Sequence, residues 1–175
     1  PVGHPSVRHA NAPSAGRNVN RKESEIMKNL FLAGAATDLV STLASIIDEE
    51  SERNDERPRI AGVYINRLKK HMPLQADPTI KFALGDFSIH RIWSKYLDVK
   101  SPYNTYKNIG LPPGPINCPS ISSIDAVLNY ENHQYIYFCA KDDFSGYHVF
   151  AKTLAEHNRN AEAYQRALNK ERIYK

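Results

Sequence analysis

The sequence predicts an α+β fold that is mostly helical, with a C-terminal β-hairpin and a long Pro/Gly-rich loop. Several stretches repeat apolar residues at the helical period, whereas only residues 135–140 and 147–151 combine aromatic and β-branched residues around a short turn, as a hairpin does. Between these regions, residues 101–120 contain five prolines and two glycines and can hold little regular structure. Loops of this length in a compact domain are usually functional or disordered, and the tyrosines and the Pro-Pro pair favour an ordered loop.

The N-terminal part of the chain changes from polar linker to helix. Residues 1–20 are rich in Pro, Gly, Ser and Asn without a period, and we expect a flexible lead-in or linker. Residues 21–35 carry apolar residues suited to one helix. Thr37 or Asp38 is then expected to cap a second helix that ends at Glu50.

Three further helical segments are predicted before the long loop. The first spans about residues 55–70, with a proline in its first turn. The second is short: Asp77 is expected at its N-cap, Pro78 follows, and Gly85 ends it. Residues 88–98 are expected to form another helical piece.

Two helices are predicted after the loop, each begun by a capping box. Ser122 with an acid three residues on predicts a helix to about residue 128. Thr153 with Glu156 predicts a final helix that reaches about Lys170.

Composition limits the classes of function. The chain of 175 residues is long enough for one domain with a core, and its net charge of +4 is scattered, which does not indicate nucleic-acid binding. Basic residues such as those of residues 67–70 are expected to favour a helix C-terminus. Cys118 and Cys139 lack metal-binding spacing and are expected to be bystanders. No apolar run approaches the ~20 residues of a membrane span, and since the chain begins at Pro1, a membrane anchor could belong to a longer parent protein.

One acidic residue of the second helix points where its apolar residues point. At ~100° per residue, a single stripe contains Leu39, Leu43, Ile46 and Ile47. Glu50 lies within about 30° of the centre of that stripe, whereas the neighbouring acids Asp48, Glu49 and Glu52 lie over about 100° away. A carboxyl at the end of a buried face loses solvation, so its pKa should rise toward a proton-donating range. The alternative is a solvated acidic helix end.

The remaining polar residues indicate carbohydrate chemistry more than other classes. His157 and Asn158 lie on or beside the buried stripe of the final helix, and His148, in the second strand, is expected to reach the same region as His157. No HExxH pair, G-x-S-x-G elbow or Gly-rich phosphate loop is present, so we expect no metal and no cofactor. Carboxylates among tyrosines and amides suit sugar rings and hydroxyls.

Several blocks, taken in order, resemble the YceG-like (MltG-type) endolytic murein transglycosylases. The blocks are residues 43–51, 59–68, 72–79, 101–106, 110–116 and 148–158. They cover roughly residues 37–166, and the resemblance identifies residues 21–175 as a YceG-like catalytic domain. Larger members of that family carry an N-terminal transmembrane helix and a LysM-like region, neither of which is found in this chain.

The resemblance implies a reaction and a catalytic residue. The acid that ends the family's A-S-I segment corresponds to Glu50, and the implied reaction is non-hydrolytic cleavage of the MurNAc–GlcNAc β-1,4 bond of peptidoglycan, which leaves 1,6-anhydroMurNAc ends. Peptidoglycan strands are then the partner, with cell-wall synthesis proteins as further partners. The implied location is extracytoplasmic, at the periplasmic face of the inner membrane in a full-length protein.

A larger set of residues is expected to bind or position the substrate. These residues are Asn66, Gln75, Asp77, Thr79, Tyr103, Asn104, Tyr106, His148, His157 and Asn158. Two alternatives remain open: a hydrolytic muramidase with Glu50 as acid and Asp77 as base, and a catalytically silent wall-binding module.

Overall fold

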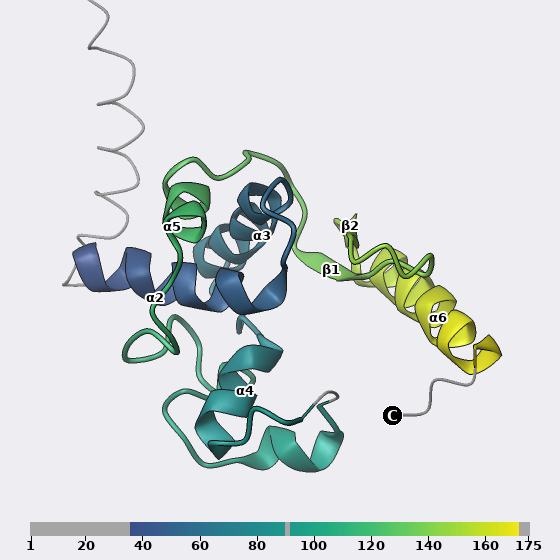
Figure 1. Cartoon of the computed structure of the whole chain (residues 1–175), viewed down its shortest axis with the longest axis horizontal. Coiled ribbons are helices and arrows are strands. Elements are labelled where there is room, and N and C mark those ends of the chain that lie inside the picture. Colours follow the sequence, from purple (N-terminus) through teal and green to yellow (C-terminus); the bar gives the residue numbers. More distant parts are fainter. Residues whose placement is uncertain (1–35, 90–91, 172–175) are drawn as a thin grey trace, which may run out of the picture.

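The computed structural model describes residues 36–89 and 92–171 and has the predicted mixture of helices and one hairpin (Figure 1). The elements are α2 (Ala36–Glu50), α3 (Arg57–Lys69), α4 (Asp77–Leu84), the 3-10 helix η1 (Ser94–Asp98), α5 (Ile121–Leu128), β1 (Tyr137–Ala140), β2 (His148–Ala151) and α6 (Leu154–Lys170). The mostly helical α+β class with a C-terminal hairpin is therefore confirmed. The lead-in at residues 1–20 and the helix expected at residues 21–35 lie outside the described residues.

The core forms where α2, α3 and α5 pack together. Its buried side chains include the apolar stripe of α2, and both Ile46 and Ile47 are fully buried. Ile60 and Tyr64 of α3 and Val127 of α5 complete this contact. Because burial of each large aliphatic side chain contributes about 1.5–3 kcal/mol, this packing fixes the rotation of α2 and with it the direction of every residue at its end.

The long loop is ordered by buried polar side chains. The Asn104 amide donates to the carbonyls of Leu97 and Val99 at 3.0 and 2.8 Å. The Thr105 hydroxyl accepts from the N–H of Ala76 at 3.0 Å, which ties the loop to the start of α4. The expectation of an ordered loop at residues 101–120 is thus met, although its regular structure is limited to turns and bends.

Two helix starts, those of α2 and α5, differ from the sequence-based expectation. Thr37 and Asp38 already lie within α2, so neither caps it. The cap of α5 is Ser120, whose extended backbone lets its hydroxyl accept from the N–H of Ser123. The hydroxyl of Ser122, which was expected to cap, accepts from the Arg57 guanidinium at 2.7 Å.

The other two differences concern α4 and the segment after it. The N-cap of α4 is Ala76, and Asp77 makes no capping hydrogen bond. In the segment expected to be helical at 88–98, the described helix is limited to the 3-10 turn of η1, and residues 90 and 91 are not described. The capping box of Thr153 and Glu156 at α6 is confirmed, as is the left-handed Gly85 that ends α4.

The hairpin lies between the helical core and α6. In its antiparallel register, Phe138 is opposite Phe150 and Tyr137 is opposite Ala151. Successive side chains of a strand point to opposite faces, so Phe138 packs edge-on against Tyr64 of the core while Tyr137 stacks on His157 of α6. Figure 1 shows the hairpin and α6 projecting together from the side of the helical core.

The segment leading to the hairpin crosses α3 at a glycine. A Cβ atom at Gly62 would lie 2.4 Å from the carbonyl oxygen of Glu131 and 2.6 Å from the His133 ring, closer than real Cβ atoms approach. The same crossing is held by Asn66, whose amide donates to the carbonyls of His133 and Tyr135 at 2.8 and 3.0 Å.

Among the described helices, none is both long and apolar enough to cross a membrane.

Candidate active site

Glu50 is the last residue of α2, and its side chain points in a different direction from those of the neighbouring acids, Asp48 and Glu49, because successive residues of a helix are rotated about its axis. Asp48 faces the starts of α3 and α5: it pairs with Arg57 of α3 at 3.1 Å and accepts from the hydroxyl of Ser123 of α5 at 2.6 Å. Glu49 is exposed and accepts from the Asn117 amide at 2.7 Å. These two acids have structural partners of their own, as their positions on the helical wheel indicate.

The environment of Glu50 raises the pKa of its carboxyl to about 7. Burial is the largest cause, and the negative charge of Asp77 adds to it. Three groups act in the opposite direction: the Tyr64 hydroxyl, which donates to Glu50 Oε1 at 2.5 Å, and the positive charges of Lys81 and Arg67. A carboxyl with this pKa is partly protonated at neutral pH, so it can donate a proton and also exist as the carboxylate.

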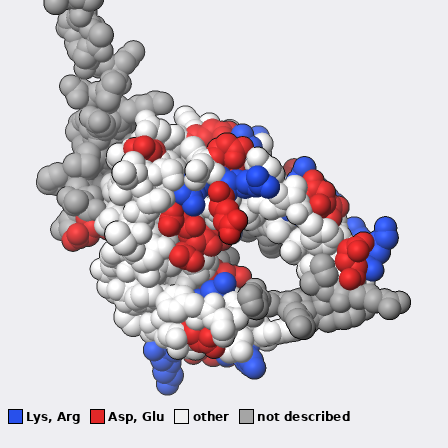
Figure 2. Space-filling model, viewed as in Figure 1, with Lys and Arg blue, Asp and Glu red and all other residues white. Residues whose placement is uncertain are grey.

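A cavity of about 490 Å³ opens beside Glu50. One wall is the turn after α2, with Ser51, Glu52 and Arg53, and the other is the hairpin, with Ala140, Gly146, Tyr147 and His148. The Arg53 guanidinium holds the two walls together, because it donates to the carbonyl of Ser145 at 2.7 Å and lies 4.7 Å from the centre of the Tyr147 ring. The volume is within the range of small-molecule sites. Figure 2 shows this side of the molecule hollowed between the core and the arm formed by the hairpin and α6.

His148 is held against the start of α3. Its main-chain N–H donates to Glu56 Oε1 at 2.9 Å, and its Nδ1 lies 2.8 Å from Glu56 Oε2. This contact fixes the orientation of the ring at the wall of the Glu50 cavity. The expected meeting of His148 with His157 is wrong, because His148 packs on Phe138 at the core face of the hairpin while His157 stacks on Tyr137 at the opposite face.

A buried arginine joins the elements behind Glu50. Arg67 is 8% exposed, and its guanidinium donates to the carbonyls of Ile136 and Leu74, each at 2.7 Å, and to Gln75 Oε1 at 3.2 Å. It also lies 5.2 Å from the centre of the Tyr137 ring. The sequence pattern grouped Arg67 with the basic end of α3, but only the folded structure shows that this side chain points inward.

Asp77 and Tyr106 form a second polar pair near Glu50. The Tyr106 hydroxyl donates to Asp77 Oδ1, and burial of the carboxyl raises the pKa of Asp77 above its usual range, although the residue as a whole is exposed. The capping role expected for Asp77 is therefore wrong. Because its charge also raises the pKa of Glu50, Asp77 belongs to the electrostatic environment of the site.

The other predicted residues have different surroundings. Thr79 and Asn104 are fully buried and make their hydrogen bonds within the protein, so they shape the loop instead of facing the cavity. Tyr103 packs on Phe82 with ring centres 4.6 Å apart, and Asn158 is exposed on α6. Gln75 is exposed beside Arg67.

Two functional candidates were missed by the sequence analysis: Tyr64 and Arg67. The Tyr64 ring belongs to the apolar core, and a pattern of apolar residues does not reveal that its hydroxyl contacts Glu50. Tyr64 and Arg67 lie three positions apart on α3, so they share one face of the helix. That spacing was the signal in the sequence that both side chains point toward the same site.

The fold and the site define a class of protein: a helical α+β domain that holds a carboxyl of near-neutral pKa beside a polar and aromatic cavity. The model of the YceG-like family matches residues 13–163. The chain therefore belongs to the YceG-like family.

Proteins similar to this chain carry a common name. An "Endolytic murein transglycosylase" of Bacillus subtilis is 45% identical over 146 residues, which are 83% of this chain and 39% of that protein. One of the same name from Streptococcus pneumoniae is 37% identical over 73% of this chain and 24% of its own length. The crystal structure of a yceG-like protein from Listeria monocytogenes, 42% identical, superposes with a TM-score of 0.68 over 80% of this chain and 45% of that one. The chain thus spans less than half the length of these relatives.

Proposed function

We propose that this domain, residues 21–175, is an endolytic lytic transglycosylase that cleaves the MurNAc–GlcNAc β-1,4 bond of peptidoglycan without water. The observation that supports the chemistry most is the Glu50 carboxyl, whose pKa of about 7 suits proton donation near neutral pH. The names of two relatives support the substrate, since those of Bacillus subtilis and Streptococcus pneumoniae are each called an endolytic murein transglycosylase.

One carboxyl can perform both proton transfers of this reaction. Protonated Glu50 donates to the glycosidic oxygen while the bond from that oxygen to C1 of MurNAc breaks and C1 gains oxocarbenium character. The Glu50 carboxylate then takes the proton of the C6 hydroxyl of the same sugar as O6 bonds to C1. The product ends in 1,6-anhydroMurNAc, and Glu50 is protonated again.

The groups around Glu50 suit this cycle. The Tyr64 hydroxyl and the Arg67 guanidinium both favour the ionised carboxyl, so they stabilise it after it has donated its proton. Three of the predicted residues are best placed to orient a sugar: His148, Gln75 and Tyr106. None of them is fully buried, and a hydrogen bond within the protein orients each side chain.

A hydrolytic muramidase is the second candidate, and one observation favours it. Asp77 lies near enough to Glu50 to raise its pKa, and a second carboxylate at a glycosidase site can activate a water molecule. In this structure the Asp77 carboxyl is already engaged by Tyr106, which favours a supporting role.

Two variants and one mass measurement decide between these functions. E50Q should abolish cleavage of isolated glycan strands, whereas E49Q, which alters an exposed acid one residue away, should cleave like the wild type. Products of the transglycosylase end in anhydro sugars and are lighter by one water than hydrolysis products. Recovery of reducing-end products alone would establish the muramidase, and an E50Q variant that cleaves normally would point to a site elsewhere. If neither the wild type nor E49Q cleaves glycan that both still bind, the domain is a wall-binding module.

The proposed substrate sets the location of the activity. Peptidoglycan lies outside the cytoplasmic membrane, so we propose that this domain acts there as part of a longer protein anchored near its N-terminus. Cell-wall synthesis proteins remain proposed partners of such a protein.

A further inference from the structure

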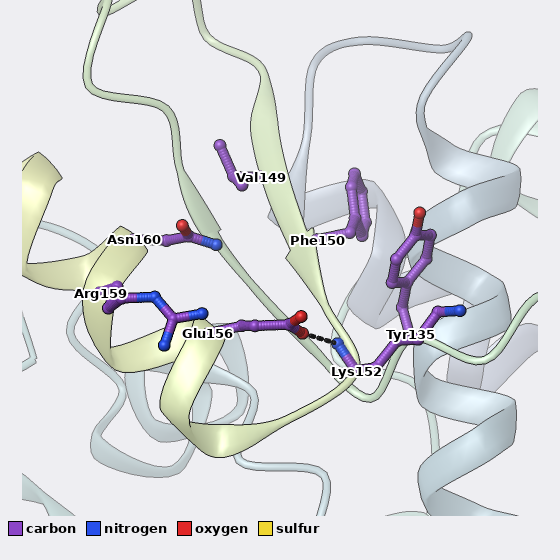
Figure 3. A pocket seen from close by; sticks show the side chains of 7 residues that line it. All are labelled: Tyr135, Val149, Phe150, Lys152, Glu156, Arg159 and Asn160. Carbon is purple, nitrogen blue, oxygen red and sulfur yellow. Dashed lines mark hydrogen bonds between the residues drawn. The ribbon is translucent and has the colours of Figure 1, made fainter.

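A second cavity lies next to the first along strand β2. It has a volume of about 430 Å³ and is bounded by the strand, by the segment that enters the hairpin and by the first turns of α6 (Figure 3). His148 lines the Glu50 cavity, while Val149 and Phe150 line this one. The two cavities are therefore lined by consecutive residues of one strand, which rises about 3.3 Å per residue.

The second cavity carries more positive than negative charge, since Lys152, Arg159 and one acid, Glu156, line it, and main-chain hydrogen bonds together with the Arg159 charge lower the pKa of Glu156. Lys152 and Arg159 are exposed, and neither forms an ion pair within residues 36–89 and 92–171. The acid between them, Glu156, is committed to the capping box, where its Oε2 accepts from the N–H groups of Lys152 and Thr153 at 3.0 and 3.2 Å. Figure 3 shows the Asn160 amide directed into the space beside Arg159. Arg159 and the Asn160 amide thus lie together on the α6 side, where an acidic group can bind, while the Lys152 side chain extends toward Tyr135 (Figure 3).

The opposite wall of the cavity is aromatic. Tyr135 and Phe150 lie side by side with ring centres 5.8 Å apart (Figure 3). The Arg59 guanidinium lies 5.5 Å from the centre of the Phe150 ring, but it is already paired with Glu131 at 2.9 Å. The cavity therefore presents the rings of Tyr135 and Phe150, with Lys152 beside them, on one side and Arg159 with Asn160 on the other (Figure 3).

The main chain of β2 adds groups that a peptide can bond to. The N–H of His148 points away from β1, since it donates to Glu56. In an antiparallel pair this direction repeats every second residue, so the N–H and C=O of Phe150 also point away from β1. Within the described part of the chain, no hydrogen bond satisfies this N–H from outside the sheet.

We propose that this second cavity binds the stem peptide of a peptidoglycan strand whose MurNAc unit lies at Glu50. The stem peptide is attached to that same sugar and carries free carboxylates, which match Lys152 and Arg159 in charge. Its methyl groups match the aromatic wall, and its amides match the outer edge of β2. The proposal rests on the proposed function, which supplies the identity of the polymer.

Binding to a form that does not cleave tests the peptide site apart from catalysis. The E50Q protein is titrated with N-acetylmuramyl-L-alanyl-D-glutamate and with N-acetylmuramic acid, and affinities are measured by calorimetry or by amide chemical shifts. We expect the peptide-bearing probe to bind several-fold more tightly and to shift the Val149 and Phe150 amides. Adding R159A should reduce this preference about threefold, and R159A with K152A about tenfold, as expected for exposed charge pairs.

R166A is the matched control, because Arg166 is an exposed arginine on α6 two turns beyond Arg159 and pairs with Glu162. It should leave both affinities unchanged. Equal affinity for the two probes, or a preference that R159A and R166A reduce alike, would overturn the peptide site. If the probes behave as expected but the wild type cleaves no glycan, the peptide site stands and the proposed function fails.

Discussion

Replacing Tyr64 by phenylalanine isolates the hydrogen bond that controls the acidity of Glu50. The variant keeps the ring that packs on Phe138 in the core and removes only the hydroxyl that donates to Glu50 Oε1 at 2.5 Å. That bond lowers the pKa of Glu50, so without it the pKa should rise above the wild-type value of about 7.

The size of the change follows from the energy of the bond. A hydrogen bond to a charged group contributes about 1.5–3 kcal/mol, and 1.36 kcal/mol corresponds to one pH unit, so full loss would raise the pKa by roughly 1 to 2. Glu50 retains some exposure, and water can replace part of the bond, which favours the lower end. If Glu50 must be protonated to start the reaction, activity falls as pH rises through its pKa. The falling limb should therefore move about 1 pH unit higher in Y64F.

The assay is the rate of release of anhydro-ended fragments, followed by mass spectrometry from pH 5 to 9. Y130F is the matched control, because the Tyr130 hydroxyl accepts a hydrogen bond from the exposed Lys69 at 3.3 Å and not from a group of the Glu50 site, and its profile should match the wild type. A limb that stays in place in a folded Y64F protein, or that moves to lower pH, would refute the assignment of Glu50 as the acid.

Two further predictions concern stability. The pKa of Glu50 rises on folding from 4.5 to about 7, so the folded state binds more protons than the unfolded state, and ionised Glu50 destabilises the fold as pH rises through that range. E50Q should therefore raise the free energy of unfolding by at most about 3 kcal/mol at pH 8 and have little effect at pH 4. Urea denaturation measures this difference, with E49Q as the control. G62A should lower the free energy of unfolding by about 1–3 kcal/mol, because its Cβ would overlap the Glu131 carbonyl. G114A is the control: its Cβ would lie 3.4 Å from the nearest atom, so its free energy of unfolding should differ from that of the wild type by less than about 1 kcal/mol. A G62A protein as stable as the wild type would show that the crossing segment can shift freely.

Local patterns predicted those features that depend on residues close in sequence. The capping box of Thr153 and Glu156 and the left-handed Gly85 each depend on only a few consecutive residues, and both were found as expected. The local pattern failed to choose between two nearby serines. Ser120 caps α5 where Ser122 was expected to, and the Arg57 guanidinium, which is distant in sequence, donates to both hydroxyls, at 3.0 and 2.7 Å.

The direction of Glu50 was also available from the sequence, because one helix with one apolar stripe determines which of its acids turns inward. Its acidity was not available. The contacts that set it come from Tyr64, Arg67 and Asp77, which lie 14 to 27 positions away and approach only when α2, α3 and α4 pack together. The same holds for the two histidines, since the pleat of β1 separates His148 from His157. The sequence by itself thus determined the hairpin, the order of the main helices and the inward acid, while several helix starts and the segment at residues 88–98 differed. Only tertiary packing decided the partners that tune this acid, because desolvation and Coulomb interactions act through space and not along the chain.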